Sequence, residues 1–162
     1  MTNQIHELAL RQLKDYRSIN PGTCFSEPGF SLDISNAYAV QDEVVRLRVQ
    51  EAERVVGYKV GCTGPGTTKL FSMKGPIRGT LFDKEVLENG VNLDPNSFCN
   101  LTVEAEMVIK VGEEGQISFV FPVIELHNFV FRAQKKIFVR VDCKQWSQQR
   151  YNTIRAELGK VT

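Results

Sequence analysis

The feature that most constrains this chain is the run LTVEAEMVIK at residues 101–110, in which apolar and polar side chains alternate. Alternation with this period predicts a half-buried strand. Side chains two residues apart on a strand lie on the same face, so Glu104 and Glu106 are expected to project together. A strand here therefore holds two carboxylates close to each other.

Two carboxylates held that close repel each other unless a cation or a shared proton relieves the repulsion. A third acid, Glu125, stands in the apolar stretch FPVIELHNF, where an unpaired charge is costly. Three converging carboxylates would offer the hard oxygen ligands that Mg²⁺ or Mn²⁺ prefers. The plainer interpretation is that Glu104 and Glu106 line the solvated face of an ordinary strand, and spacing alone favours it.

Composition limits the possible partners and compartment. The 162 residues fit one domain with a sizeable core, and 42% hydrophobic residues with a net charge of +1 are ordinary for a globular protein. Such a balance gives no argument for nucleic acid or an anionic membrane as partner. The N-terminus lacks a signal-peptide pattern, no apolar run reaches transmembrane length, and four scattered cysteines indicate reduced thiols, so we expect a cytoplasmic protein. With only two histidines, a histidine-rich zinc site is not expected.

The chain divides into a helical part, residues 1–50, and a β-rich part, residues 51–136. Apolar residues at helical spacing predict two helices, the second of which starts near Ser35 as N-cap and carries Arg48 on its solvent side. Short apolar runs broken by glycine then predict strands with tight turns, including a hairpin at residues 113–115. The fold class expected from this order is α+β.

Five segments in order resemble the 2-keto-4-pentenoate hydratase (2-oxo-hepta-3-ene-1,7-dioate hydratase) family, within the fumarylacetoacetate hydrolase superfamily. They are NAYAVQDEVV (36–45), VVGYKVGCTGPG (55–66), GPIRGTLFD (75–83), VEAEMVIKVG (103–112) and PVIELHNFVFR (122–132). Their order and spacing agree with the family as well as their residue types. The resemblance implies a mixed β-roll or sandwich of the fumarylacetoacetase C-terminal-domain type after the N-terminal helices. It also favours the metal interpretation of the carboxylates over the solvated strand.

The resemblance implies a site and a reaction. Glu104, Glu106 and Glu125 would ligate one divalent cation, Mg²⁺ or Mn²⁺, and Lys59 would act beside it as proton donor or fixed positive charge. The cation would chelate a small 2-hydroxydienoate, or its 2-oxo tautomer, and stabilise the dienolate as a Lewis acid. The expected activity is hydration of 2-hydroxy-2,4-dienoates in aromatic catabolism. The alternatives are decarboxylation of a 2-oxo-3-enedioate of the 4-oxalocrotonate type, and a catalytically inactive fragment.

Other residues near these motifs carry further expectations. The backbone amides at Cys62 and Thr63, in a glycine-rich turn, could bind the substrate carboxylate; the alternative is that these glycines only permit a sharp turn. His127 is interpreted as a structural histidine rather than a ligand, and Tyr58 and Phe82 as core residues. Some family members carry an acid within the segment GPIRG, which has none here, and this bears on the substrate and the reaction type.

The resemblance stops after about residue 136. Residues 137–162 resemble nothing in the family, but reading residues 140–147 from the second base of each codon permits ELIANNG, as family members carry at this place. We therefore expect a chain truncated or frameshifted after about residue 136, with an out-of-frame, non-native tail at 137–162. Loss of the remaining family sequence would leave strands without partners and part of the core without cover. Full-length relatives are expected to be homo-oligomers.

Overall fold

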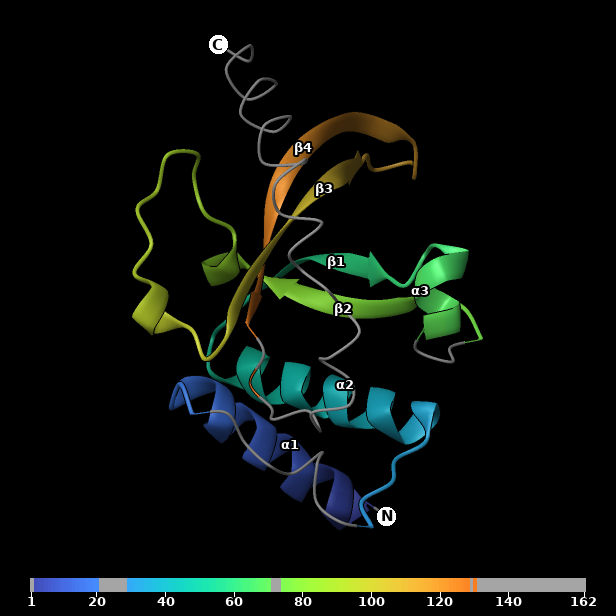
Figure 1. Ribbon diagram of the computed structural model, residues 1–162, viewed down its shortest axis with the longest axis vertical. Coiled ribbons are helices and arrows are strands. Elements are labelled where there is room, and N and C mark those ends of the chain that lie inside the picture. Colours follow the sequence, from blue (N-terminus) through green and yellow to red (C-terminus); the bar gives the residue numbers. More distant parts are fainter. Residues whose placement is uncertain (1, 21–28, 71–73, 129, 131–162) are drawn as a thin grey trace. The chain divides into compact units, whose positions relative to one another are not determined.

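The computed structural model describes residues 2–20, 29–70, 74–128 and 130 (Figure 1). By their contacts these residues divide into two units, and each is described by itself. The second unit contains β3 (Leu101–Val111) and β4 (Ile117–Asn128), and the first contains α1 (Thr2–Arg17), α2 (Ile34–Gln50), β1 (Val55–Gly61), α3 (Pro65–Leu70) and β2 (Ile77–Phe82). Helices combined with antiparallel strands confirm the α+β class. The predicted tail at residues 137–162 lies outside the described residues.

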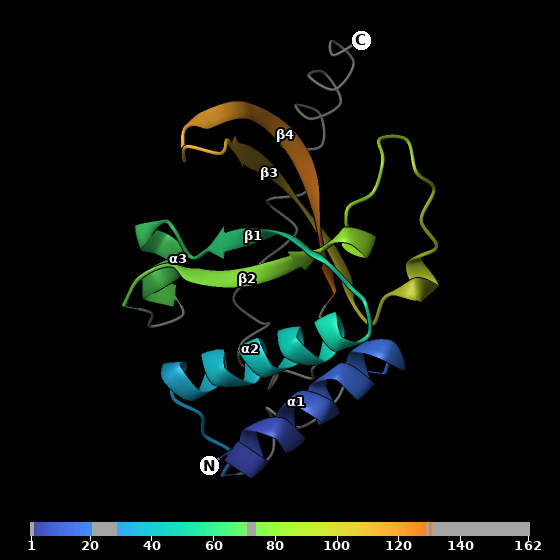
Figure 2. The same ribbon diagram turned by 180° about the vertical axis from the view of Figure 1, so that it is seen from behind.

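In the first unit α1 and α2 pack side by side (Figures 1 and 2). Their contact is made by the apolar stripes read from the sequence, since Ala9 is 0%, Leu13 5% and Val40 4% exposed. An ion pair joins the same helices, in which Nδ1 of His6 lies 2.6 Å from Oε1 of Glu43. Burial of the stripes is therefore the main stabilising term of this helix pair.

The start of α2 differs from the prediction. The helix begins at Ile34, and its N-cap is Asp33, whose carboxylate accepts a hydrogen bond of 2.8 Å from the backbone N of Asn36. Ser35 is therefore not the cap; it lies in the first turn. Both residue types are good caps, and here the residue just before the first helical position takes the role.

β1 and β2 form an antiparallel pair that contacts α2 through Arg78. The backbone N of Arg78 donates to the hydroxyl of Tyr38 at 3.2 Å, and its carbonyl accepts from the side chain of Gln41 at 3.1 Å. The guanidinium of Arg78 lies 3.1 Å from the carboxylate of Asp42. These polar contacts fix β2 against the helix.

Arg48 forms the most connected contact of the first unit, and its predicted solvent-facing position is wrong. The residue is 9% exposed, and its guanidinium lies 2.6 Å from Glu53 and 2.8 Å from Glu85. The same guanidinium stacks 3.6 Å above the ring of Phe82, which is 2% exposed. Burial and the negative charge of Glu85 raise the pKa of Tyr16, whose hydroxyl donates to that carboxylate at 3.1 Å. The guanidinium of Arg48 on α2 thus contacts Phe82 of β2 and Glu85 of the short 3₁₀ turn Asp83–Glu85. Through Glu85 it is also linked to Tyr16 of α1.

The second unit is a long hairpin. β3 and β4 pair antiparallel over their whole length, and the tight turn between them holds Gly115 at φ 81°, a conformation that glycine adopts without strain. The amide of Gly112 donates to the carbonyl of Gln116 at 2.8 Å and closes the turn. The hairpin predicted at residues 113–115 is confirmed.

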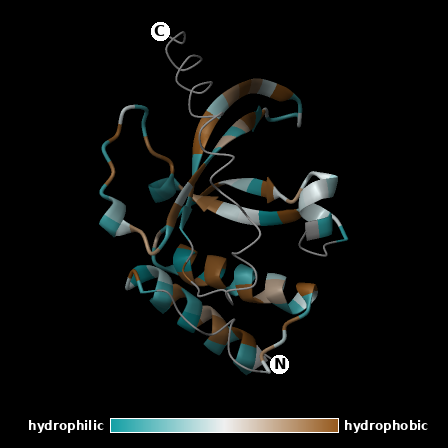
Figure 3. Ribbon diagram, viewed as in Figure 1, coloured by the Kyte–Doolittle hydropathy of each residue, from teal (hydrophilic) through white to brown (hydrophobic). Residues whose placement is uncertain are grey.

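One face of this hairpin is apolar and exposed. Figure 3 shows apolar stretches, in brown, along both strands. The residues that alternate with Glu104 on β3, and those paired with them on β4, include Val103 (41% exposed), Met107 (58%), Ile109 (53%), Val120 (53%) and Ile124 (52%). A two-stranded hairpin with so much exposed apolar surface is marginally stable by itself.

Within the described residues, no helix combines the length and the apolar character that a membrane span requires.

Removing Arg48 should strongly destabilise the first unit. Arg48→Ala leaves the carboxylates of Glu53 and Glu85 without their shared cation, and removal of one partner of a buried pair costs about 3 kcal/mol or more. Arg48→Met, which keeps the side-chain volume, should recover only part of that loss. Urea unfolding measures both variants against Arg46→Ala, whose exposed pair with Glu43 is expected to contribute less than about 1 kcal/mol. Equal losses for Arg48→Ala and Arg46→Ala would contradict this account.

Candidate metal centre

The register of β3 and β4 places two acids directly opposite each other. Glu104 pairs with Glu125, while one step along the same face Thr102 pairs with His127 and Glu106 pairs with Val123. Because side chains two residues apart share a face, all six of these side chains project from the same side of the hairpin. The alternation that predicted the strand thus also sets the composition of the site.

Three side chains on this face bring their donor atoms together. One ligand atom each from Glu104, Glu125 and His127 lies within 4.8 Å of the others. Nε2 of His127 is 3.4 Å from Oε2 of Glu104 and 3.6 Å from Oε1 of Glu125. The side chains of Glu125 and His127 are 20% and 21% exposed, against 52% for Glu104, so one carboxylate forms the open side of the group.

The electrostatics of this group favour a cation. Like charges directly opposite on neighbouring strands destabilise a sheet, and partial burial of Glu125 strengthens the repulsion by lowering the local dielectric. A divalent cation would compensate both carboxylates at once. Two carboxylates with one imidazole form a donor set of the kind that binds divalent metals, so the residues present fit such an ion.

Glu106 is not part of this group of three. Its partner in the register is Val123, which places Glu106 one diagonal step from Glu125, the same step that separates Glu104 from His127. The backbone therefore allows its carboxylate to approach Glu125, whereas the side chain is exposed in the structure. The ligand role of Glu106 stays a prediction.

Lys59 belongs to the first unit, so its predicted place beside the carboxylates stays a prediction. It lies on the more buried face of β1, while its neighbours Tyr58 and Val60 are 67% and 63% exposed on the other face. The core position predicted for Tyr58 is therefore wrong. Opposite Lys59 stands Gly79, and a Cβ there would lie 3.0 Å from Cγ of the lysine. Glycine at this position leaves room for the lysine stem.

The glycine-rich turn after β1 carries Cys62 and Thr63. Cys62 is half-buried and has a φ of 55°, which is unusual for a residue with a side chain, and Thr63 is exposed. Gly64 follows, and its carbonyl accepts from the backbone N of Thr68 at 3.1 Å, so the turn leads directly into α3. This geometry fits a sharp turn, and the substrate-binding role of Cys62 and Thr63 stays a prediction.

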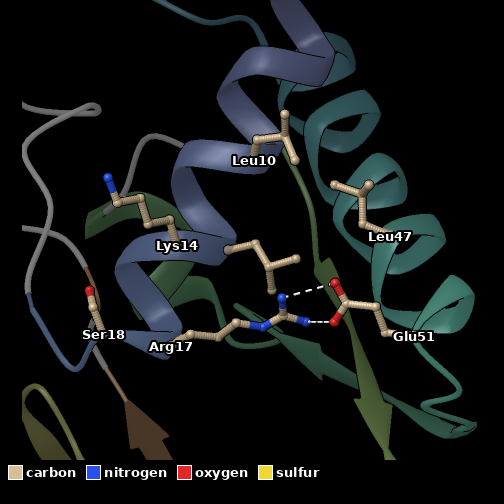
Figure 4. A pocket seen from close by; sticks show the side chains of 7 residues that line it. Leu10, Lys14, Arg17, Ser18, Leu47 and Glu51 are labelled. Carbon is tan, nitrogen blue, oxygen red and sulfur yellow. Dashed lines mark hydrogen bonds and ion pairs between the residues drawn. The ribbon is translucent and has the colours of Figure 1, made fainter.

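An open groove lies on the first unit between α1 and α2 (Figure 4). Leu10 and Leu47 line it, and Arg17 makes a bidentate ion pair with Glu51 across it. The groove contains none of the residues that the sequence predicted for the site. Arg17 and Glu51 neutralise each other, and the lining residues offer no further acid to the remaining charged side chain, Lys14, so we assign no chemistry to the groove.

His127 is the residue that the sequence interpretation placed outside the ligand set. The spacing in the sequence already indicated that His127 lies near the acids, because it follows Glu125 by two residues and must share its face if the strand continues. What the sequence did not show is the register, which sets Glu104 diagonally across from His127.

Three curated relatives match the chain over part of its length. It is 27% identical over 111 residues to 2-oxo-hept-4-ene-1,7-dioate hydratase of Escherichia coli, a match that spans 67% of this chain and 42% of the relative. It is 35% identical over 77 residues to 2-keto-4-pentenoate hydratase of Burkholderia vietnamiensis (strain G4), over 48% of this chain and 29% of the relative. It is 28% identical over 98 residues to 2-hydroxypent-2,4-dienoate hydratase of Pseudomonas putida, over 60% and 40%. These matches confirm the resemblance to 2-keto-4-pentenoate hydratases, although no family model matches the chain.

Solved structures with a similar fold include 4-oxalocrotonate decarboxylase from Pseudomonas putida G7. Its complex with magnesium and adipate aligns with a TM-score of 0.75 at 22% identity, covering 83% of this chain and 56% of that one. Its complex with calcium and acetate gives a TM-score of 0.73 at the same 22% identity, over 81% and 55%. At this identity the likeness shows the fold alone. The chain thus spans less than half of the curated relatives and little more than half of the solved chains.

Replacing one of the opposed carboxylates should affect the metal-free and the metal-loaded protein in opposite directions. Without a cation, Glu104→Gln removes a like-charge pair worth roughly 0.2–1 kcal/mol, so the free energy of unfolding should stay equal or rise. With Mn²⁺ at about 100 times its dissociation constant, the wild type should gain about 2.7 kcal/mol, and the variant far less. Urea unfolding with and without Mn²⁺ measures both effects.

The control is Glu114→Gln, in the turn at the other end of the hairpin, which should gain as much from Mn²⁺ as the wild type does. If Glu104→Gln also gained as much as this control, the two opposed carboxylates would not be holding the cation.

Proposed function

We propose that this chain is part of a metal-dependent hydratase that adds water to 2-hydroxy-2,4-dienoates of the 2-oxopent-4-enoate type. The observation that carries the proposal is the opposition of Glu104 and Glu125, with His127 beside them, on one face of β3–β4. The three curated relatives are hydratases of such compounds by name, and two solved complexes of similar fold contain magnesium or calcium. A β-roll or sandwich built around this hairpin is the architecture we expect for the whole protein.

Each residue has a role in this proposal. Glu104 and Glu125 would hold the divalent cation, Mg²⁺ or Mn²⁺, with a third donor from Glu106 or His127. When bound, the cation would supply Lewis-acid stabilisation for a substrate that chelates it through a carboxylate and the adjacent 2-oxygen. Hydration also requires a proton at the far carbon of the diene, and Nζ of Lys59 is the proposed donor. The backbone amides of the turn at Cys62 and Thr63 would orient the substrate carboxylate.

A second reaction class uses the same parts. Loss of CO₂ from a 2-oxo-3-enedioate leads to the same dienolate, and 4-oxalocrotonate decarboxylase is a solved protein whose fold this chain resembles. The choice between water addition and decarboxylation would then depend on the groups that protonate the far carbon and deliver water to the adjacent conjugated carbon, rather than on the carboxylates. A catalytically inactive fragment is the third possibility, since the chain spans only part of its relatives.

A direct assay separates these three possibilities. The purified chain with Mg²⁺ is expected to consume freshly generated 2-hydroxypenta-2,4-dienoate, measured by loss of its ultraviolet absorbance, without release of CO₂. CO₂ release from a 2-oxo-3-enedioate, without turnover of the dienoate, would support the decarboxylase. Absence of both reactions, with a cation shown to be bound, would support the inactive fragment.

Lys59→Met should lower the kcat of the hydration by about 100-fold or more, because a positioned general acid contributes 10²–10⁴-fold, roughly, to such reactions. Cation binding should be unchanged, since the ammonium group is no ligand. The matched control is Lys69→Met on α3, an exposed lysine whose loss should leave kcat within about twofold. An unchanged kcat for Lys59→Met would remove Lys59 from the proposed mechanism.

A further inference from the structure

We propose that the apolar face of the β3–β4 hairpin is an interface with a second copy of this chain. The apolar face consists of the side chains that alternate with Glu104 and Glu106 on β3, together with those paired with them on β4. It lies on the side of the hairpin that carries no carboxylate. The proposal therefore depends neither on the cation nor on the reaction proposed above.

The apolar face carries no charged side chain along the two strands. Its central pairs consist only of aliphatic side chains, one methionine and one proline, namely Val103–Leu126, Ala105–Ile124, Met107–Pro122 and Ile109–Val120. Single apolar side chains are common on protein surfaces, whereas a contiguous apolar patch on this scale marks an interaction site. The face is therefore expected to be covered in solution.

The exposed area of the apolar face matches what a small symmetric dimer needs. Met107 is 58%, Ile109 53% and Ile124 52% exposed. Across the whole face, such fractions leave roughly 600–700 Å² of apolar surface on each copy, so a symmetric contact would bury roughly 1,200–1,400 Å², which lies within the range of specific interfaces. The face is thus large enough to hold two copies together without help from the first unit.

A second copy fits this face in shape and in charge. Sheets pack face to face when their twists match, and a copy of the hairpin carries the same right-handed twist. Since the face is uncharged, a two-fold contact sets no charge against another, and it leaves Glu104, Glu106 and Glu125 on the outer sides of the pair. Contact through the opposite face would bring two sets of acids together. The face also offers no charged group that would select a different partner.

The dimer would remove the structural weakness of the hairpin. Two strands with an exposed apolar side are marginally stable, whereas two such hairpins stacked on each other form a four-stranded sandwich with a closed apolar layer. In an isologous contact, the two-fold axis passes near the middle of the face. Met107 lies there, in the pair next to Ala105–Ile124, so the Met107 side chains of the two copies would lie close together.

The test measures the mass of the full chain in solution by sedimentation equilibrium at micromolar concentrations. We expect a mass twice that of one chain, with and without Mn²⁺. Met107→Glu should raise the dissociation constant of the dimer at least about 100-fold, because two like charges would meet near the axis. The matched control is Val91→Glu, at a residue of the first unit that is 48% exposed, and it should remain dimeric.

A mixing experiment shows that a loss of the dimer is not a loss of folding. Met107→Glu and Met107→Lys should each be monomeric alone, and an equimolar mixture should form the mixed dimer, since the two charges then attract each other. A monomeric wild type would overturn the proposal and indicate that the chain covers its own face. Dimers that survive Met107→Glu, a mixture that stays monomeric, or masses that grow without limit would overturn it as well.

Discussion

The second unit depends on one electrostatic constraint, the placement of Glu104 directly opposite Glu125 in an antiparallel register. A shift by one residue would move every side chain of one strand to the other face, and the apolar residues that alternate with these acids would follow. The hairpin therefore cannot relieve the repulsion by slipping without exposing a different set of side chains. A positive charge between the two carboxylates would relieve the repulsion, and among the described residues the group that lies closest to both is the imidazole of His127.

In the first unit, two converging carboxylates are compensated by a side chain of the protein. There Glu53 and Glu85 also converge, but Arg48 lies between them and stacks on Phe82, so the chain supplies a permanent cation that is paired on every side. A guanidinium in this setting has no exchangeable position for a ligand. The two clusters therefore differ in what compensates their acids: arginine does so in the first unit, whereas in the second unit we propose a metal ion for this role.

Local patterns predicted the elements well, and tertiary contacts explain where the predictions failed. The alternation around Glu104 and the apolar stripes through Leu13 and Val40 are local signals, and strands and helices appear where they indicate them. Arg48 was expected at the surface because a charge on a helix usually is, and only the approach of two distant acids makes its burial favourable. Tyr58 was expected in the core because of its type, yet it is 67% exposed. For the candidate site, the shared face of Glu104 and Glu106 followed from the sequence, whereas the placement of Glu125 and His127 on that same face required the register.

The precision of the site depends on the face that carries no ligands. Bound metals need their ligands within a few tenths of an ångström of the right positions, and a two-stranded hairpin is too flexible by itself to hold them so. The face opposite the carboxylates exposes Met107, Ile109 and Val120 by more than half of their surface. Polypeptide packed on that face would bury apolar surface and stiffen both strands, although it would touch none of the ligands. Affinity for the proposed cation would therefore be coupled to cover of the apolar face, because rigidity gained on one side of the hairpin reduces the cost of ordering the ligands on the other.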